Sequence, residues 1–480
     1  MTKALRQAQG ERKGLATKAL RQAQGGRKGK TVRAELFSFR AEPPSVRAEP
    51  VEALSARLAA AGIHSLLIQF ADLHGTAKGK LVPLAQLPEL LATGAGFAGP
   101  SIWGTGLPRT GPRSEYYARG DAATAQPLPW LPGVARVVGS GWVDGQPFEA
   151  CPRQVLHRAL ARLKAAGLTM QLGIEPEFFL LKRDASGRIV PADDADRLAK
   201  PSYDLASLQR PIALLHELQH TLQACGFEVQ QIDHEDAHGQ YELNWRHADA
   251  LTSCDRLMLF KLAAQALAER HGLLFSMMPK PFEGQPGSGL HFHVSLWRDE
   301  AGPGSLADGV ARHFIGGVLA HARALCALAA PTVNGYKRLG AAASISGTTW
   351  SPGAIAHGPN NRTAPVRTLP GRFEWRVPDA SANIYLAVAT LIAAGLDGIE
   401  RRLDPGLACT DDLYDTPHPE LPRLPTSLDE ALDALEADAV VAGALGPELL
   451  ANFVALKREE SLAWRAHVSD WERARYATAF

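Results

Sequence analysis

The sequence of 480 residues contains only five cysteines, and no two of them lie close together. They stand at positions 151, 225, 254, 326 and 409 and form no Cys-x-x-Cys pair. Closely spaced thiols are typical of zinc sites, and regularly paired cysteines are typical of secreted domains held by disulfides. We therefore exclude both classes and expect a protein of a reducing compartment, the cytoplasm.

Long apolar runs and excess charge are also absent. No apolar run approaches the ~18 residues that a transmembrane helix needs, and the formal net charge is +1 at pH 7. Bulk charge therefore gives no basis for a nucleic-acid or membrane partner. The content of 46% hydrophobic and 21% charged residues is that of a globular protein, and the length predicts two domains.

The first fifty residues differ from the rest of the chain. The octapeptide at 3–10 returns at 18–25, and the tetrapeptide at 32–35 returns at 46–49. This segment has twelve Lys or Arg against four Asp or Glu, and it lacks the apolar stretch of a secretory signal. A transit peptide or a nucleic-acid arm has similar composition. We favour a disordered basic extension at 1–50, which a repeat translated upstream of the true start would explain.

Four segments alternate ionisable and apolar side chains with the period of a β-strand: 173–180, 240–244, 290–296 and 372–376. Successive side chains of a strand point to opposite faces. One face would carry Glu175, Glu177, Glu242, His291, His293, Ser295, Arg372, Glu374 and Arg376. A single segment of this kind fits a surface strand with salt bridges, but four predict one sheet with a core on one side and a shared polar cavity on the other.

The remaining pattern predicts an α+β fold. Amphipathic or apolar helical stretches cover 51–61, 152–167, 208–225, 248–271, 313–330, 383–401 and 447–478. Strands are expected at 63–70 and 128–138, and segments rich in Gly, Pro and small polar residues at 94–112 and 339–370 are expected to be functional loops. Helices alternating with antiparallel strands indicate a catalytic domain built on a curved sheet, with a domain boundary near residue 148.

Six side chains offer metal ligands without a thiolate: Glu175, Glu177, Glu235, Glu242, His291 and Glu374. Oxygen donors with one imidazole suit Mg²⁺ or Mn²⁺. Six ligands suit two ions, and ion pairs commonly clamp a transferring phosphoryl group. Nearby arginines suit phosphate and carboxylate oxygens: Arg338, Arg362, Arg367, Arg372 and Arg376. The residues thus point to metal-dependent phosphoryl transfer with a nucleotide and an acidic substrate.

Taken together, the segments at 173–180, 234–244, 287–293, 334–339 and 372–376 resemble the glutamine synthetase family, most closely its type III glutamate–ammonia ligases and γ-glutamylmethylamide synthetases. The resemblance covers residues 51–480. It implies an N-terminal β-grasp domain at 51–148, a catalytic domain at 149–480, and a homo-oligomeric dodecamer of two hexameric rings. It also implies activation of glutamate by ATP as γ-glutamyl phosphate, followed by displacement of phosphate by an amine.

The resemblance implies roles for individual residues. The first metal would be held by Glu177, Glu235 and Glu242, and the second by Glu175, His291 and Glu374. ATP would contact His293, Ser295, Arg367 and Arg372. Glutamate would contact Arg338, Arg376 and Gly287, and Arg362 would stabilise the transferring phosphoryl group. Tyr414 falls where some bacterial members are adenylylated, although an ordinary surface tyrosine fits that position better.

Three positions depart from the family pattern. Ala98 stands where ammonium-using members have an aspartate, no acidic residue occurs from 339 to 373 where a lid glutamate is usual, and Pro286 replaces an asparagine. The missing acids would bind and deprotonate ammonium. We therefore favour a small alkylamine as the acceptor, with Asp121 or Glu235 taking the proton. Glutamine synthesis from ammonia is the alternative, and a catalytically silent structural or regulatory relative is a remote one.

Overall fold

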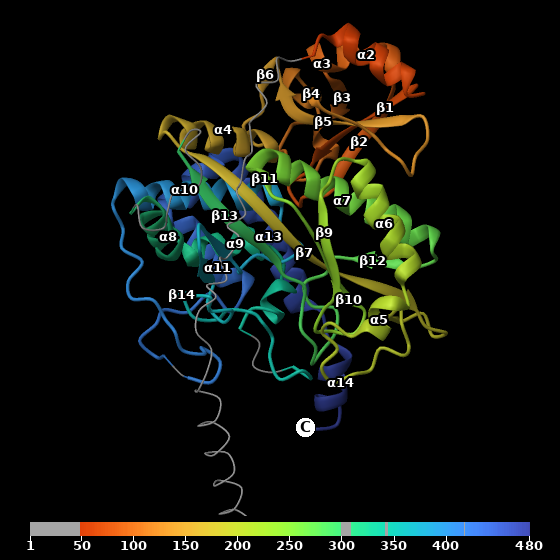
Figure 1. Ribbon diagram of the computed structural model, residues 1–480. Helices are drawn as coiled ribbons and strands as arrows, with labels where there is room; N and C mark the ends of the chain where they lie inside the picture. Colours follow the sequence, from red (N-terminus) through yellow and green to blue (C-terminus); the bar gives the residue numbers. More distant parts are fainter. Residues whose placement is uncertain (1–48, 299–308, 341–343, 417) are drawn as a thin grey trace, which may run out of the picture. The chain divides into compact units, whose positions relative to one another are not determined.

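The computed structural model describes residues 49–298, 309–340, 344–416 and 418–480 (Figure 1). The basic extension expected at 1–50 lies outside these ranges except for its last two residues. Two sheets and a set of helices make up the described chain.

The first sheet is formed by residues that precede position 148. Its strands follow the order β2-β1-β5-β4-β3, and β6 pairs with β5. The neighbours β1 and β5 run parallel, and the other pairs run antiparallel. Its elements are α2 (Val51–Ala60), β1 (Ser65–Ala71), β2 (Ala77–Pro83), α3 (Leu87–Ala92), β3 (Ala95–Ala98), β4 (Glu115–Pro127), β5 (Val134–Val143) and β6 (Gln146–Pro147). Because the described chain packs as one unit, the β-grasp assignment and the boundary after residue 148 stay predictions.

The second sheet has ten strands and contains every segment that was expected to carry an ionisable face. Its main path is β14-β15-β16-β13-β7-β10-β9, with β8, β11 and β12 also paired to β7. Only β14 and β15 are parallel. The strands are β7 (Thr169–Arg183), β8 (Ile189–Pro191), β9 (Val229–His234), β10 (Gln240–Trp245), β11 (Ala248–Asp249), β12 (Leu274–Ser276), β13 (Leu290–Trp297), β14 (His357–Pro359), β15 (Val366–Leu369) and β16 (Arg372–Trp375). The expected mixed fold with a curved, mainly antiparallel sheet is confirmed.

Helices pack against the apolar side of this sheet and against one another (Figure 1). They are α4 (Pro152–Ala165), α5 (Leu205–Gln209), α6 (Ile212–Ala224), α7 (Ala250–Arg270), α8 (Val310–Ala320), α9 (Ala322–Ala329), α10 (Ile384–Glu400), α11 (Leu428–Ala437), α12 (Ala439–Leu445), α13 (Pro447–Ala466) and α14 (Asp470–Tyr476). In the described chain no single helix is long and apolar enough to cross a membrane; α12 with α13–α14 passes such a test only as a pair bent by 102°.

The buried centre of the helical layer is α10, which was expected to be apolar nearly all round. It contacts α4, α7, α8, α9 and α12. Gly317 lets α8 approach it closely, since a Cβ at that position would lie 2.0 Å from the carbonyl oxygen of Ala394. The side chain of Asn383 caps α10 and also donates to the carbonyl oxygens of Asp72 and Leu73. This cap therefore ties the start of the central helix to the turn between β1 and β2.

Several expected elements have different bounds. The segment at 94–112 is not all loop, since it contains β3, and 339–370 contains β14 and β15. The helix expected at 208–225 is divided near Pro211, and that at 313–330 is divided at His321. The strand expected from 128 begins at Val134, because Gly133 has φ +80° and completes a turn. Helices α11 and α12 were not foreseen.

Candidate active site

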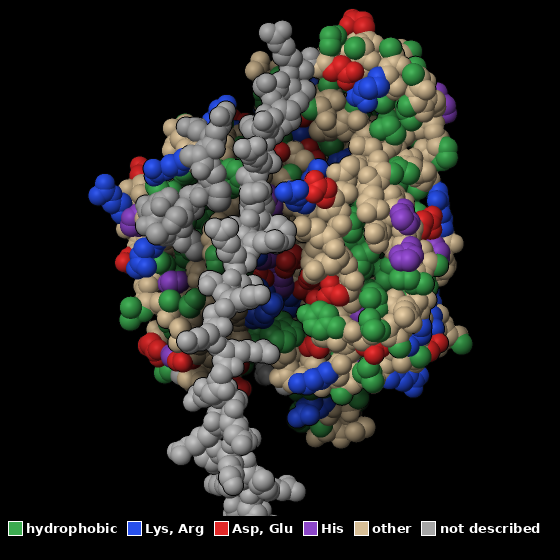
Figure 2. Space-filling model, in the orientation of Figure 1, with side chains coloured by type: hydrophobic (Ala, Val, Ile, Leu, Met, Phe, Trp, Pro, Cys, Tyr) green, Lys and Arg blue, Asp and Glu red, His purple; other side chains and the backbone are tan. Residues whose placement is uncertain are grey.

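The polar faces of the second sheet enclose a cavity of about 500 Å³. Strand pairing sets its chemistry, because Glu175 lies opposite His291, Glu177 opposite Glu242, and His293 opposite Glu374. Acidic and basic side chains gather in a hollow on this face of the molecule (Figure 2). Most predicted site residues line the cavity: Glu175, Glu177, Glu235, Glu242, Gly287, His291, His293, Arg338, Arg362, Arg367, Arg372 and Arg376.

One part of the cavity is crowded with carboxylates. Glu177 accepts hydrogen bonds from the backbone N–H of Gly289 at 2.7 Å and from Gln240 at 2.9 Å. Burial, together with Glu177 and Asp233, raises the pKa of Glu235 well above its usual range, and burial with neighbouring glutamates does the same for the pKa of Glu242. Buried carboxylates that repel one another are a site for cations.

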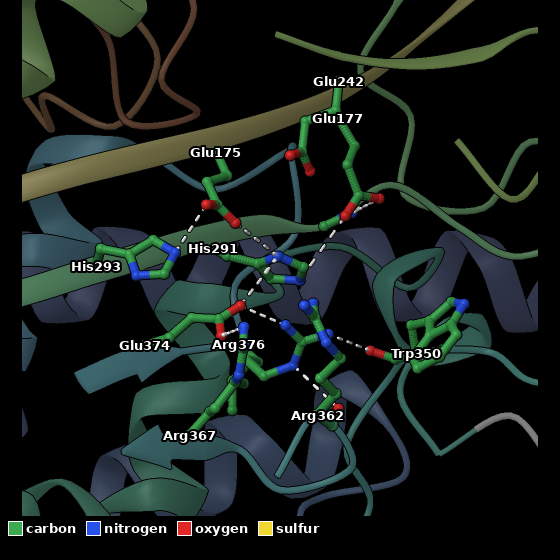
Figure 3. A network of polar contacts seen from close by, with 12 residues as sticks. Glu175, Glu177, Glu242, His291, His293, Trp350, Arg362, Arg367, Glu374 and Arg376 are labelled. Atoms are coloured by element: carbon green, nitrogen blue, oxygen red, sulfur yellow. Dashed lines mark hydrogen bonds and ion pairs between the residues drawn. The ribbon is translucent and has the colours of Figure 1, made fainter. Parts of the chain in front are cut away.

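A second cluster combines carboxylates with imidazoles (Figure 3). His293 Nε2 lies 2.8 Å from Glu175 Oε1, and His291 Nδ1 lies 3.7 Å from Glu175 Oε2 and 3.5 Å from Glu374 Oε1. Burial would raise the pKa of Glu175, but the two histidines outweigh it and hold that pKa well below its usual range. The Nε2 atom of His291 is buried and makes no hydrogen bond in the described chain, and the nearest carboxylate oxygen, Glu177 Oε1, lies 3.8 Å from it.

These donors fit divalent cations. Ligand atoms of Glu175, His293 and Glu374 lie within 4.8 Å of one another, and so do those of Glu175, Glu242 and His291. Oxygen-rich sets with imidazole and no thiolate suit Mg²⁺ or Mn²⁺. The grouping crosses the expected division, since His293 was assigned to ATP and Glu242 to the other metal. The assignment of each ligand to one of two ions therefore stays a prediction.

Arginines occupy the other side of the cavity (Figure 3). Arg376 donates to one oxygen of Glu374, and Arg367 donates to the other at 2.8 Å. Burial raises the pKa of Glu374, but Arg376 and both histidines overcome it and bring that pKa to about 2. Arg338 is 3% exposed and donates to the carbonyl oxygens of Val377 and Arg376. Its guanidinium is therefore held in place before any substrate arrives.

Among the residues expected to contact ATP, three line the cavity and one does not. The three that line it are His293, Arg367 and Arg372. Arg372 Nε donates to His293 Nδ1 at 3.1 Å, so these two residues are hydrogen-bonded to each other. Ser295 lies outside the lining, and its hydroxyl accepts a hydrogen bond from the Trp297 indole at 3.0 Å. Ser295 is on β13 two residues beyond His293 and on the same face of the strand, so its contact with ATP stays a prediction.

Asp121 is not brought to the cavity of its own chain. It lies on β4, and its carboxylate accepts from Arg153 at 2.9 Å. Arg153 in turn is held by Asp255 and by the hydroxyl of Ser140. The structure thus places Asp121, whose side chain is 34% exposed, at the edge of an ionic network that links β4, β5, α4 and α7, and not in the cavity lining.

Other lining residues were missed by the sequence reasoning. Asp233 on β9 and Asn244 on β10 could have been found, because each lies two residues from an expected ligand, Glu235 or Glu242. Burial and two glutamates raise the pKa of Asp233 to about 6. Tyr203, Asp236 and Trp350 also line the cavity, but they lie in loops where no periodicity marks them.

Comparison with known protein families identifies the family of this chain. Residues 149–476 match the family described as glutamine synthetase, catalytic domain. The chain belongs to the glutamine synthetase family. This confirms the resemblance inferred from the sequence.

Two similar proteins of this family differ in the acceptor that their names give. A glutamate–methylamine ligase of Methyloversatilis universalis is 45% identical over 428 residues, which cover 86% of this chain and 96% of that protein. A glutamine synthetase of Rhizobium leguminosarum bv. phaseoli is 39% identical over 422 residues, with the same shares of each chain.

Two solved structures are also similar to this chain. A GmaS/ADP complex superposes with a TM-score of 0.82 at 40% identity, covering 88% of this chain and 99% of that one. A GmaS structure without ligand gives a TM-score of 0.81 at 38% identity, with 89% and 99% covered. The fold is thus shared along nearly the whole of those chains.

Proposed function

We propose that this protein is an ATP-dependent glutamate–amine ligase that forms γ-glutamyl phosphate and then a γ-glutamyl amide. The observation that carries the proposal is the division of one cavity into a carboxylate–imidazole side and an arginine side. Cations on the first side and guanidinium groups on the second suit the transfer of a phosphoryl group from a polyphosphate to an acidic substrate. A free carboxylate is a poor acyl donor, so activation as an acyl phosphate explains the need for ATP.

In the first step the glutamate γ-carboxylate attacks the terminal phosphorus of ATP, a new O–P bond forms, and ADP leaves. Glu177, Glu235 and Glu242 and the set of Glu175, His291 and Glu374 would hold two divalent cations, which neutralise phosphate oxygens when bound. Arg367, Arg372 and His293 would bind ATP. Arg338, Arg376 and the backbone at Gly287 would orient glutamate. Arg362 would stabilise the transferring group, since its exposed guanidinium lines the cavity.

In the second step the amine nitrogen attacks the γ-carbonyl carbon, a C–N bond forms, and the C–O bond to phosphate breaks. An alkylamine resembles the lysine amino group and is protonated at neutral pH, so it must lose a proton first. Glu235 lines the cavity, and we propose that its carboxylate takes the proton that the amine releases.

A small alkylamine is the acceptor that we favour. Residues 339–373 contain no acid, and Ala98 replaces an aspartate of the family pattern. The 45% identity to a protein named glutamate–methylamine ligase supports the same reading. Ammonia remains the alternative acceptor, because glutamine synthetases are also similar over the same length.

We also infer a homo-oligomer, in the family arrangement of two hexameric rings. The C-terminal segment supports association with other copies, because it exposes large apolar side chains: Leu462, Trp464, Val468, Trp471, Tyr476 and Phe480. Exposed apolar groups gathered in one segment mark interaction surfaces. The segment is α13, α14 and the last residues of the chain.

Phosphate release by the purified protein tests the ligase proposal. Release is expected only when ATP, glutamate, Mg²⁺ and an amine are all present, and omission of any one should abolish it. Methylamine and ammonium are supplied in separate series. Release with neither amine, or release that does not depend on glutamate, would overturn the proposal. No release under any of these conditions would favour the silent relative.

A further inference from the structure

Two aromatic residues that line the cavity have backbone conformations that bulky side chains rarely adopt. Tyr203 has φ +64° and Trp350 has φ +53°. Left-handed conformations are strained for large residues, and such strain gathers at binding and catalytic sites. Both rings stay partly open to solvent, with Trp350 39% exposed. The strained backbone at these two positions therefore carries side chains that line the cavity and are not part of the hydrophobic core.

The indole of Trp350 is fixed by a buried carboxylate. Its Nε1–H donates to Asp236 Oδ2 at 3.0 Å, and the hydroxyl of Ser346 donates to the same oxygen. The hydroxyl of Ser202 donates to Asp236 Oδ1 at 2.8 Å. Asp236 is 5% exposed and joins three segments that are distant in the sequence. The only polar atom of the indole is thus occupied, which leaves the ring itself for a ligand.

The backbone around Trp350 is held as well. Its carbonyl oxygen accepts from Arg376 Nη2 at 3.3 Å (Figure 3). The next carbonyl, of Ser351, accepts from the hydroxyl of Tyr414 at 3.0 Å. Arg376 is one of the proposed glutamate arginines, so the bond from its guanidinium couples Trp350 to the site where the acyl group would be formed.

The aromatic surface that Trp350 contributes to the cavity suits an alkylammonium ion. The stretch that carries Trp350 has no acid from 339 to 373, so it offers an aromatic surface and no carboxylate of its own. A cation is attracted to an indole face, and an alkyl group packs against it. An N–H bonded to a carboxylate leaves the ring richer in electron density, which strengthens that attraction. Ammonium has no alkyl group and therefore lacks the packing part of this interaction.

We propose that Trp350 selects an alkylamine over ammonium by packing its indole against the N-alkyl group, and that Asp236 is the residue that positions the indole. The inference rests on the proposed ligase function and names the element that decides its acceptor. The chemistry is unchanged: the amine gives its proton to a cavity carboxylate and displaces phosphate from γ-glutamyl phosphate.

The test is the ratio of kcat/KM for methylamine to kcat/KM for ammonium, measured on the full-length protein. In Trp350→Leu we expect this ratio to fall about tenfold, and in Trp350→Phe about threefold, because phenylalanine keeps a face but not the N–H. Asp236→Asn is expected to lower the ratio by an intermediate amount. The KM values for glutamate and ATP should stay close to those of the wild type, which a general structural defect would not allow.

Trp142→Phe is the matched control, because Trp142 lies on β5 and stacks with Arg119, outside the cavity lining. Its ratio should equal that of the wild type. If Trp350→Leu does not fold, the ratio is read from Trp350→Phe and Asp236→Asn. Ratios within about twofold of the wild type in the folded variants would overturn the role of Trp350. A wild-type enzyme that is inactive with both amines would instead overturn the ligase function itself.

Discussion

Arg376 donates to the carboxylate of Glu374, two residues before it on the same face of the sheet. The other oxygen of that carboxylate accepts from Arg367 at 2.8 Å, and His291 lies 3.5 Å from the first. Glu374 is fully buried, and Arg376 is 3% exposed. One glutamate thus connects the arginine side of the cavity with the metal-binding side.

Glu374→Ala is expected to lower the affinity for Mg²⁺ by about tenfold to a hundredfold, because the cluster loses a ligand and the arginines lose their partner. Activity measured against Mg²⁺ concentration gives the shift, and calorimetric titration with Mg²⁺ gives it independently of turnover. Glu400→Ala, an exposed glutamate at the end of α10, should leave both unchanged. Unchanged ligase activity in Glu374→Ala would refute its assignment as a metal ligand.

Arg362→Ala is expected to lower kcat about a hundredfold or more with a small effect on the KM for glutamate, because a guanidinium that acts on the transferring phosphoryl group acts in the transition state. Steady-state kinetics with varied glutamate and ATP measures both constants. Arg362→Lys is the matched variant, which keeps the charge but not the planar fork, and should recover part of the loss. A large rise in KM with an unchanged kcat would show that Arg362 only binds substrate.

The buried pair of Arg153 and Asp255 is expected to stabilise the fold. Arg153 donates to both oxygens of Asp255 at 3.2 and 2.9 Å, and the hydroxyl of Tyr385 donates to Asp255 Oδ1 at 2.7 Å. Arg153→Ala would leave this carboxylate buried without its cation, at a cost of about 3–5 kcal/mol in the free energy of unfolding. Urea unfolding measures it, with Arg158→Ala, an exposed arginine one turn later on α4, as the control. Equal loss in both variants would contradict the role of the pair.

His321 predicts a pH dependence of stability. Its Nδ1 lies 2.6 Å from Asp438 and its Nε2 lies 3.0 Å from Asp397, which also pairs with Arg401. The bond to Asp438 raises the pKa of His321, burial lowers it, and the bond to Asp397 raises it, with a net upward shift. Since the folded state binds this proton more tightly than the unfolded chain, the stabilisation is complete below pH ~6.5 and is lost as the pH rises through the folded pKa.

Thermal unfolding between pH 6 and 9 tests this dependence. The difference in stability between the wild type and His321→Gln should be largest near pH 6 and should shrink toward pH 9. His220→Gln, an exposed histidine on α6, should show no such trend. A difference that grows with pH would reverse the sign and contradict the account.

The site could be predicted where its residues repeat with the period of a strand, and not where they lie in loops. Glu175 and Glu177, His291 and His293, and Glu374 and Arg376 each alternate with apolar neighbours, and pairing of β7, β13 and β16 brings them together. Trp350 and Asp236 belong to no repeat, and their contact joins positions 114 residues apart. Alternation gives the face of a strand but not where the cavity ends, and Ser295 shares the face of His293 but lies outside the cavity lining.

Some elements of the fold could likewise be predicted from the sequence, and others could not. The central helix α10 was foreseen because its sequence is apolar on every side, and α4 because Pro152 starts it and its leucines share one face. The sequence pattern missed the division of the helix after residue 320, because apolar residues continue across His321 while the backbone turns there. Asp121 was expected at the cavity, but its long-range pairing with Arg153 could not be read from local sequence.

Competition between two amines tests the central claim most directly. Methylamine and ammonium are supplied together at equal concentration with ATP, glutamate and Mg²⁺, and the two products are quantified by mass. The ratio of products equals the ratio of kcat/KM. We expect γ-glutamylmethylamide to exceed glutamine by at least about tenfold, a transition-state difference of about 1.4 kcal/mol. An excess of glutamine would contradict the account and identify the enzyme as a glutamine synthetase that uses ammonia.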